Sequence, residues 1–361
     1  MEIKVNLNKR SDRTYKIQIG RKDFSSLKKL IPQKFAPDKC IVVTDSNVKR
    51  IYNSEIKAVF LSSKEHRSFV ITIPAGEKSK SQKVRDKLER EIIKLNPSRQ
   101  SLLIAFGGGV VGDIAGFLAS TILRGIKYIQ VPTTIISQVD SSVGGKTGIN
   151  LPESKNLIGT IYQPAHVQID IDFIQTLPEE EYFNGLAEIV KSFIIADEKA
   201  FGYLEKNING LLKRNPQTLQ YCIKQSVGIK SKIVEQDENE TGLRKILNFG
   251  HTVGHAIEAC SNYRVKHGFA VAEGILVEAQ ISNQLGKLSE NDLQRIKNIL
   301  EKFGLSKNIR RKYDFNSIWK KILFDKKKNK NGVGFSLISK IGKCEYNILV
   351  ERYVVKSAYN K

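Results

Sequence analysis

The sequence lacks the features that mark secreted, membrane-spanning and thiolate-zinc proteins. Its 361 residues include four cysteines, Cys40, Cys222, Cys260 and Cys344, and no Cys-x-x-Cys pair. Neither a disulfide framework nor a thiolate zinc site is therefore predicted. No apolar run approaches the roughly 20 residues that a membrane-spanning helix needs. Residues 1–9 alternate apolar and charged side chains, which is not a signal-peptide pattern. We expect a cytoplasmic protein with no membrane partner.

Acidic residues are few compared with basic ones. The chain has 59 Lys and Arg against 37 Asp and Glu, a formal net charge of +22. Such an excess fits nucleic acid, an anionic surface or an acidic small substrate. No helix-turn-helix, zinc finger or RNA-binding aromatic motif accompanies it, and the lysines are spread over the whole chain. Most of these lysines are expected to lie on solvated faces and nucleic acid is not expected as a partner, with a basic nucleic-acid-binding protein as the non-enzymatic alternative.

Histidine is also scarce, and three of the five histidines fall close together. His251 and His255 are four residues apart, which places both on one face of a helix at the spacing of a metal pair. His267 follows beside a glycine. Thr252 stands where the zincin pattern requires glutamate, so a metalloprotease is disfavoured. Three neutral nitrogens, or two with a carboxylate, would leave an open position on zinc. The alternative is a set of hydrogen-bonded histidines in a packed helix.

The first half of the chain has the pattern of strands that alternate with helices. Residues 1–20 predict a β-hairpin. Strands are predicted at 41–44, 70–73, 102–106 and 128–132, and helices at 81–95 and 114–122. The pattern up to Ile171 predicts a doubly wound, nucleotide-binding α/β domain over residues 1–171.

A glycine-rich turn, Gly107–Asp113, lies between a predicted strand and a predicted helix. This arrangement presents backbone N–H groups and a helix N-terminus to a pyrophosphate. The spacing is not that of Gly-x-Gly-x-x-Gly, so a tight packing turn is the alternative. The later run Gly144–Thr147 is not a P-loop, because Asp140 stands where the upstream glycine is required. An ATPase is therefore not predicted.

From Asp172 onward the composition becomes that of helices. Apolar residues recur with helical spacing at 200–212, 218–233, 270–285 and 290–303, in addition to the helix that carries the histidines. We predict a mainly α-helical domain over residues 172–361.

Several long motifs resemble those of the 3-dehydroquinate synthase family. They are Gly107–Asp113, Arg124-Gly125, Gln130–Thr134, Gln138–Lys146, Lys155–Gly159, Gly185–Glu188, Leu247–His255 and His267-Gly268. The resemblance extends from about Asp45 to Lys327. It implies an N-terminal nucleotide-binding α/β domain, a helical C-terminal domain, NAD, one divalent metal (zinc or cobalt) and a homodimer.

The resemblance also implies a reaction of the shikimate pathway. The substrate is 3-deoxy-D-arabino-heptulosonate 7-phosphate, and the products are 3-dehydroquinate and phosphate. NAD oxidises a substrate hydroxyl transiently, phosphate is eliminated, the ketone is reduced again and an internal aldol addition closes the ring. The alternative is another NAD- and metal-dependent sugar phosphate cyclase, of the 2-deoxy-scyllo-inosose or valiolone type. A glycerol dehydrogenase type of enzyme would instead release NADH.

Matched position by position, the resemblance implies the residues around the substrate. The metal ligands would be Glu188, His251 and His267, which replaces the pairing of His251 with His255. His255 would then serve the phosphate end of the substrate. The cationic residues would be Arg124, Lys146, Lys155, Lys191, Lys230, Arg244 and Lys327, with the choice among Lys326, Lys327 and Lys328 left open. Hydrogen bonds to hydroxyls and lysines would come from Asp140, Asn156, Glu240 and Asn248.

The NAD-binding residues implied by the resemblance lie mostly in the first half of the chain. Asp45 and Asn47 would contact the adenosine ribose, and Glu77 and Lys80 lie in a following loop. The others are Gly108, Gly109 and Asp113 around the pyrophosphate, then Thr133, Thr134, Thr176 and Leu177, with Lys146 and Lys155 shared with the substrate.

Overall fold

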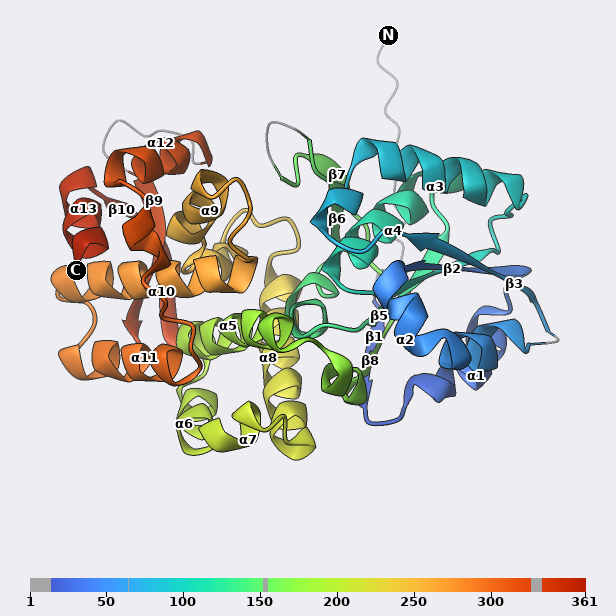
Figure 1. The fold of residues 1–361 in the computed structure, drawn as a ribbon, viewed down its shortest axis with the longest axis horizontal. Coiled ribbons are helices and arrows are strands. Elements are labelled where there is room, and N and C mark those ends of the chain that lie inside the picture. The colour runs from blue at the N-terminus through green and yellow to red at the C-terminus, as the bar shows by residue number, and fades with distance from the viewer. Residues whose placement is uncertain (1–13, 64, 152–154, 326–332) are drawn as a thin grey trace, which may run out of the picture. The chain divides into compact units, whose positions relative to one another are not determined.

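The computed structural model describes residues 14–63, 65–151, 155–325 and 333–361 (Figure 1). The predicted substrate lysines Lys326, Lys327 and Lys328, and most of the predicted N-terminal hairpin, lie outside these ranges. The chain forms two compact units. One comprises the described residues within 1–18, 23–131 and 145–169, and the other comprises the described residues within 19–22, 132–144 and 170–361.

The first unit is built on a six-stranded sheet. The strand order is β1-β8-β5-β4-β2-β3, and β2 runs parallel to both β3 and β4, as β5 does to β8. The strands β4 and β8 are buried along their whole length, as expected of a sheet covered on both faces. Their bounds are β1 Lys16–Gly20, β2 Lys39–Asp45, β3 Arg67–Ile73, β4 Leu102–Gly107, β5 Lys127–Pro132 and β8 His166–Asp170.

Helices cover both faces of this sheet. On one face, α3 (Gln82–Lys94) and α4 (Gly109–Thr121) pack against Ile41, Val43 and Leu103. On the other face, Phe24 stacks on Phe106 with ring centroids 5.0 Å apart. Successive strand residues point to opposite faces, so the apolar runs of β2 and β4 serve both layers. Figure 1 shows α3 and α4 on one side of the sheet, and α1 (Leu27–Leu30) and α2 (Ser46–Ile56) on the other.

Short elements complete the first unit. The strands β6 (Lys146–Ile149) and β7 (Ile158–Ile161) form an antiparallel ribbon that packs on α4. The single-turn helices are η1 Phe24–Ser26, η2 Ile31–Phe35, η3 Lys57–Leu61, η4 Glu77–Ser79 and η5 Ile122–Arg124.

The second unit is organised around α10 (His267–Gln284). Residues Gly268 to Ser282 of this helix are all buried, as expected of a helix surrounded by other elements. Around it pack α5 (Glu179–Ala196), α9 (His251–Cys260), α11 (Glu290–Lys302) and α13 (Arg352–Asn360) (Figure 1). The remaining elements are α6 Glu198–Lys206, α7 Ile208–Leu212, α8 Pro216–Gln236, α12 Phe315–Asp325, η6 Ser137–Ser141, η7 Ile171–Thr176, η8 Leu243–Asn248 and η9 Ile309–Lys312.

The second unit also contains a β-hairpin that the sequence analysis did not predict. The strands β9 (Val333–Lys340) and β10 (Lys343–Val350) pair antiparallel, and Phe335 and Leu337 enter the core beside α12 and α13. The turn is Ile341-Gly342, with Gly342 at φ +88°. It lacks the Asn-Gly or Asp-Gly signal of a two-residue turn. The predicted class, an α/β N-terminal domain with a mainly helical C-terminal domain, is confirmed.

Among the described residues, no helix has both the length and the apolarity that crossing a bilayer requires.

Candidate metal centre and the residues around it

Three helices of the second unit bring Glu188, His251 and His267 together. The Oε1 atom of Glu188 lies 3.7 Å from Nε2 of His251 and 3.4 Å from Nε2 of His267. A tetrahedral zinc ion with bonds of about 2.0–2.2 Å separates its ligand atoms by roughly 3.3–3.6 Å. The three side chains therefore fit a divalent metal with little rearrangement.

One oxygen of the buried Glu188 carboxylate has no hydrogen-bond partner among the described residues. Glu188 is 1% exposed, and its Oε2 accepts a hydrogen bond from Nζ of Lys191 at 2.5 Å. Its Oε1 is buried and faces the two histidine nitrogens without a well-formed hydrogen bond in the described structure. An unsatisfied buried carboxylate oxygen is costly. A metal ion at this position would satisfy it.

The other ring nitrogen of each histidine is held by a hydrogen bond. Nδ1 of His267 donates to Oε2 of Glu258 at 3.0 Å, and Nδ1 of His251 donates to the carbonyl of Phe249 at 3.2 Å. Such partners fix the ring orientation of a metal ligand and leave Nε2 for the metal. Glu258 was not predicted, although it lies seven residues after His251 on the same face of α9.

Charges around the three side chains shift their pKa values in different directions. Burial alone would raise the pKa of Glu188, but Lys191 and the two histidines bring it well below its ordinary range. Burial and the charge of Lys191 lower the pKa of His251, so its ring is neutral. Burial also opposes charge on His267, but Glu258 and Glu188 outweigh it and raise the pKa to about 10. A metal ion would therefore displace a proton from His267.

His255 does not pair with His251 as the helical spacing suggested. The two rings meet edge to face at a centroid distance of 5.2 Å. In the described residues, no three-ligand group contains both of them. His255 is exposed and instead groups with Glu258 and His267, with one ligand atom from each within 4.8 Å of the others.

Two more buried cations lie in the same unit as the metal set. Lys230 contacts the carboxylate of Asp140 and donates to its carbonyl oxygen at 2.7 Å. Arg244 donates to the carbonyls of Glu238 at 2.6 Å and Gly144 at 3.1 Å. Gly144 has φ +95°, and a Cβ there would lie 2.6 Å from the Arg244 guanidinium. Only glycine allows this approach.

The Asp140–Lys230 pair is held charged by mutual attraction. Burial lowers the pKa of Lys230, and Asp140 partly offsets this shift. Burial would raise the pKa of Asp140, but Lys230 outweighs it and the pKa is lowered. Close by in sequence to Arg244, Nδ2 of Asn248 donates to Oε1 of Glu240 at 2.7 Å. The second unit thus holds these predicted residues in hydrogen-bonded pairs.

In the first unit, the predicted NAD-binding residues follow the ends of parallel strands. Asp45 ends β2 and accepts from the backbone N–H groups of Asn47 and Val48 at 2.8 and 3.1 Å, which caps α2. Gly108 is the N-cap of α4 and offers no side-chain cap. The N–H groups of the first turn of α4, from Gly109, are therefore available to an anion.

Lys80 joins predicted cofactor and substrate residues of this unit. Its ammonium lies 2.5 Å from Oδ2 of Asp113 and also contacts Oδ1 of Asn156. The backbone N–H of Asn156 donates to Oδ1 of Asn150 at 3.1 Å, and Nδ2 of Asn150 donates to Oε1 of Glu77 at 2.7 Å. Asn150 was not predicted, yet it links these groups.

The remaining predicted residues are distributed over both units. Arg124 is exposed on η5 with φ +64°, Lys146 is exposed at the start of β6, and Lys155 is half-buried. In the second unit, Thr133 is buried, and the hydroxyl of Thr134 accepts from the N–H of Ser137 at 3.1 Å. The hydroxyl of Thr176 donates to the carbonyl of Phe173 at 3.1 Å, and the carbonyl of Leu177 accepts from Arg214 at 2.7 Å.

Asn184 is a further residue that the sequence analysis missed. Its Oδ1 accepts from the N–H of Gly268 at 2.6 Å. A Cβ on Gly268 would lie 1.8 Å from the carbonyl oxygen of Asn184. The start of α10 therefore lies directly on α5, one turn before Glu188, and this contact fixes His267 relative to Glu188.

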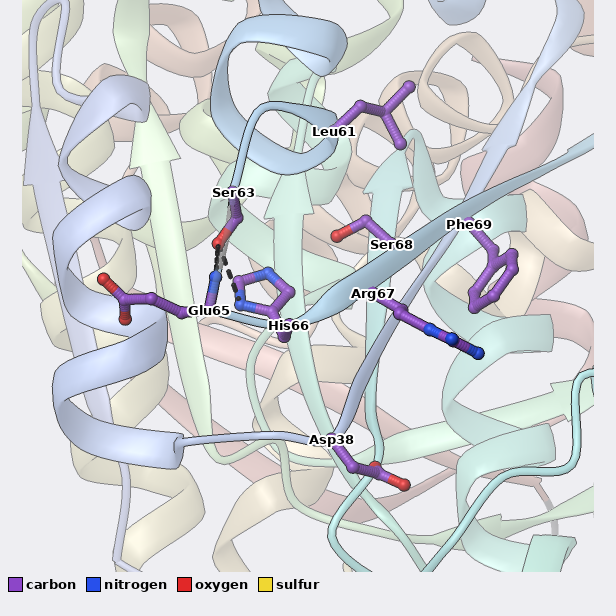
Figure 2. Close-up of a pocket in the computed structure, with 8 residues that line it drawn as sticks. All are labelled: Asp38, Leu61, Ser63, Glu65, His66, Arg67, Ser68 and Phe69. Atoms are coloured by element: carbon purple, nitrogen blue, oxygen red, sulfur yellow. Dashed lines mark hydrogen bonds between the residues drawn. The ribbon is translucent and has the colours of Figure 1, made fainter.

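A separate pocket of about 730 Å³ lies at the amino ends of β2 and β3 (Figure 2). Asp38 directly precedes β2 and Arg67 begins β3, and the hydroxyl of Ser63 lies 3.2 Å from Nδ1 of His66. Burial lowers the pKa of His66. The pocket is lined by none of the predicted site residues, and it lies at the opposite ends of the strands from Asp45 and the turn after β4.

Known proteins of one family are similar to this chain over most of its length. The family model "3-dehydroquinate synthase N-terminal" matches residues 70–184, and "3-dehydroquinate synthase C-terminal" matches residues 185–328. The 3-dehydroquinate synthase of Thermodesulfovibrio yellowstonii is 39% identical, covering 100% of this chain and 99% of the relative. That of Dictyoglomus turgidum is 44% identical, covering 92% and 91%.

Among solved structures, the fold is similar to that of a 2-deoxy-scyllo-inosose synthase complexed with carbaglucose-6-phosphate, NAD+ and Co2+. The TM-score is 0.88 with 28% identity, covering 97% of each chain. The two family models and the relatives near 40% identity are more specific than this likeness. The chain belongs to the 3-dehydroquinate synthase family.

Proposed function

We propose that this enzyme converts 3-deoxy-D-arabino-heptulosonate 7-phosphate to 3-dehydroquinate and phosphate, as a phosphate-eliminating carbon–oxygen lyase of the shikimate pathway. The observation that carries the proposal is the Glu188, His251 and His267 set, with buried, paired cations in the same unit, in a chain of this family. The metal set provides a site for substrate oxygens, and the cations complement a carboxylate and a phosphate.

The residues around the metal set would bind and orient the substrate. Lys191, Lys230 and Arg244 are each anchored by a carboxylate or a carbonyl, so little side-chain freedom is lost when an anion binds. Burial strengthens their attraction for an anion, because water does not screen them. Asp140 would keep Lys230 charged, and Glu240, which accepts a hydrogen bond from Asn248, would orient that side chain for a substrate hydroxyl.

The cofactors of this enzyme are NAD and one divalent metal, zinc or cobalt. The buried Oε1 of Glu188 and the Nε2 atoms of His251 and His267 suit the metal, and the uncapped first turn of α4 suits a pyrophosphate. When bound, the metal would polarise substrate oxygens and NAD would supply the transient oxidation. Residues 1–171 would serve NAD, and residues 172–361 would serve the metal and most of the substrate.

Other sugar phosphate cyclases remain the main alternative. The 2-deoxy-scyllo-inosose synthase shares the fold at 28% identity, whereas the 3-dehydroquinate synthases reach 39–44%. The identity therefore favours the heptulosonate phosphate as substrate.

The assembly is proposed to be a cytoplasmic homodimer that does not bind nucleic acid. Ile158 and Ile161 of β7 are each 39% exposed, and Leu157 beside them is 60% exposed. In the described structure β7 pairs only with β6. An exposed apolar strand edge promotes aggregation unless another chain covers it, so we infer that β7 of a second copy covers this edge.

The proposed reaction is tested by phosphate release from 3-deoxy-D-arabino-heptulosonate 7-phosphate with NAD and zinc, with and without a chelator, while absorbance at 340 nm is followed. We expect release that needs both cofactors and no net NADH. Net NADH would indicate a dehydrogenase. No release from folded, zinc-loaded protein would indicate a different sugar phosphate.

A further inference from the structure

The helix that carries His251 and His255 has no N-terminal cap of its own. The N-cap of α9 is Gly250, in the left-handed conformation at φ +79°, and it has no side chain that could accept a hydrogen bond. The first four N–H groups of a helix have no partner within the helix and need an acceptor nearby. For α9 this acceptor comes from another element.

Glu278 of α10 supplies the acceptor. Its side chain is 0% exposed, Oε2 accepts from the N–H of Gly250 at 2.7 Å, and Oε1 accepts from the N–H of Val253 at 3.3 Å. One carboxylate thus accepts from two of the N–H groups that have no partner within the helix, and its negative charge lies at the positive end of the helix.

The start of α9 also touches α10 along glycines. A Cβ on Gly274 would lie 1.8 Å from the carbonyl oxygen of Gly250, and one on Gly254 would lie 3.1 Å from that of Ala270. Gly274 precedes Glu278 by one helical turn, so both lie on the face of α10 that α9 covers. The cap and the glycine contact together fix the backbone immediately before His251.

We propose that Glu278 is a positioning residue of the metal centre. By capping α9 from α10, it sets His251 relative to His267, which begins α10, and thereby strengthens metal binding. The inference rests on the metal role proposed for His251. Glu278 does not need to touch the metal, because it acts through the backbone of Gly250.

Glu273 provides a matched control. It lies on the same helix, is also 0% exposed, and its Oε1 accepts from the N–H of Ile309 at 2.7 Å. Its Oε2 lies 2.7 Å from the guanidinium of Arg310. Glu273 therefore holds η9, not α9. Glu278→Gln and Glu273→Gln make the same chemical change and each removes one acceptor oxygen.

The test is a Co2+ titration of the metal-free full chain against a competing chelator, with the visible absorption of bound Co2+ recorded and thermal unfolding measured in parallel. Both variants should unfold at a lower temperature than the wild type. Only Glu278→Gln should raise the Kd for Co2+, by at least about tenfold, and alter the Co2+ spectrum. Should Glu278→Gln not fold, Glu278→Asp keeps the charge with a shorter reach and should weaken binding in the same direction.

A Kd for Glu278→Gln within twofold of the wild type would overturn the inference. An equal rise in Glu273→Gln would also overturn it, because a general loosening would then explain the effect. Wild-type protein that binds no Co2+, or His251→Ala that binds it as tightly as the wild type, would instead contradict the proposed metal set.

Discussion

His251 is one of the three proposed metal ligands, and both of its ring nitrogens face an acceptor. Its Nδ1 is held by the carbonyl of Phe249, and its Nε2 faces Glu188. His251→Ala should therefore weaken zinc binding by more than about 100-fold, beyond what the loss of a supporting residue causes, and abolish turnover. NAD affinity should not change. Zinc content after dialysis and NAD binding by fluorescence would measure both effects.

His66→Ala is the control for this variant. His66 belongs to the other unit and lies in the separate pocket, so its loss should leave the zinc content unchanged. Full zinc content in His251→Ala would contradict the assignment.

The pH range over which Lys230 stays charged depends on Asp140. Burial lowers the pKa of Lys230, and Asp140 raises it in part. In Asp140→Asn that offset is lost, so Lys230 should lose its proton at lower pH. If charged Lys230 binds the substrate anion, the alkaline limb of the kcat/KM profile should move to lower pH. The unpaired ammonium should also lower the free energy of unfolding by about 3 kcal/mol.

The matched control for Asp140→Asn is Glu345→Gln. Glu345 pairs with Lys287 at 2.9 Å in a partly exposed position, where ion pairs contribute little. It should change neither the pH profile nor the stability appreciably. An alkaline limb in Asp140→Asn at the wild-type position would show that Lys230 does not set it.

The spacing of residues along the sequence predicts only part of the candidate site. It identified His251 and His255 as neighbours on one helix, which the structure bears out. It could not identify Glu188, because α5 meets α9 and α10 only through tertiary packing. The resemblance named Glu188 and His267 because it carries such long-range information. Glu258 bonds the ring of His267, Asn184 bonds the N–H of Gly268, and Glu278 bonds the N–H of Gly250. No local sequence motif marked these three residues.

At the scale of the helices, glycine sets how closely α10 approaches α5. A Cβ on Gly268 would lie 1.8 Å from the backbone oxygen of Asn184, which cannot move aside as a side chain would. Gly268→Ala should therefore lower the free energy of unfolding by about 3 kcal/mol or more and weaken zinc binding, because His267 is displaced. Chemical denaturation and zinc titration would measure the two effects.

Gly202→Ala is the control for Gly268→Ala, because it adds the same methyl group to a helix without a clash. Gly202 lies inside α6, and nothing lies within 4 Å of the Cβ that alanine would add. Alanine should stabilise the helix by about 0.5–1 kcal/mol, through its higher helix propensity. A neutral Gly268→Ala would show that α5 and α10 can separate without cost.

Strands with continuous apolar runs and helices with clear helical spacing were predicted within a few residues, and several other elements were missed. Strands β2, β3, β4 and β5 and helices α3, α8 and α11 lie within a few residues of their predicted ranges. Helix α4 begins at Gly109, earlier than predicted, because glycine composition hides the start of a helix. The strands β6 to β10 were missed, since they are short or joined by a turn without the usual residues.

Across the whole molecule, buried cysteines report separately on the two units. Cys40 lies on β2 of the first unit and Cys222 on α8 of the second, and burial raises the pKa of each thiol to about 12. At pH 8 both should stay protonated and unreactive toward iodoacetamide in the native protein. After unfolding, a cysteine thiol has a pKa of about 8.5 and reacts with iodoacetamide. Labelling across a denaturant series, read by mass spectrometry, therefore follows each unit.

Ligands should shift these two labelling transitions differently. Zinc at about 100 times its Kd should stabilise the unit that binds it by about 2.7 kcal/mol. If Glu188, His251 and His267 hold zinc, the labelling of Cys222 should move to higher denaturant while that of Cys40 stays in place. NAD should move Cys40, because most of its proposed residues lie in the first unit. If zinc moved only the labelling transition of Cys40, the metal assignment would be contradicted. Equal shifts of both labelling transitions would mean that the two units, each with its own core, unfold as one.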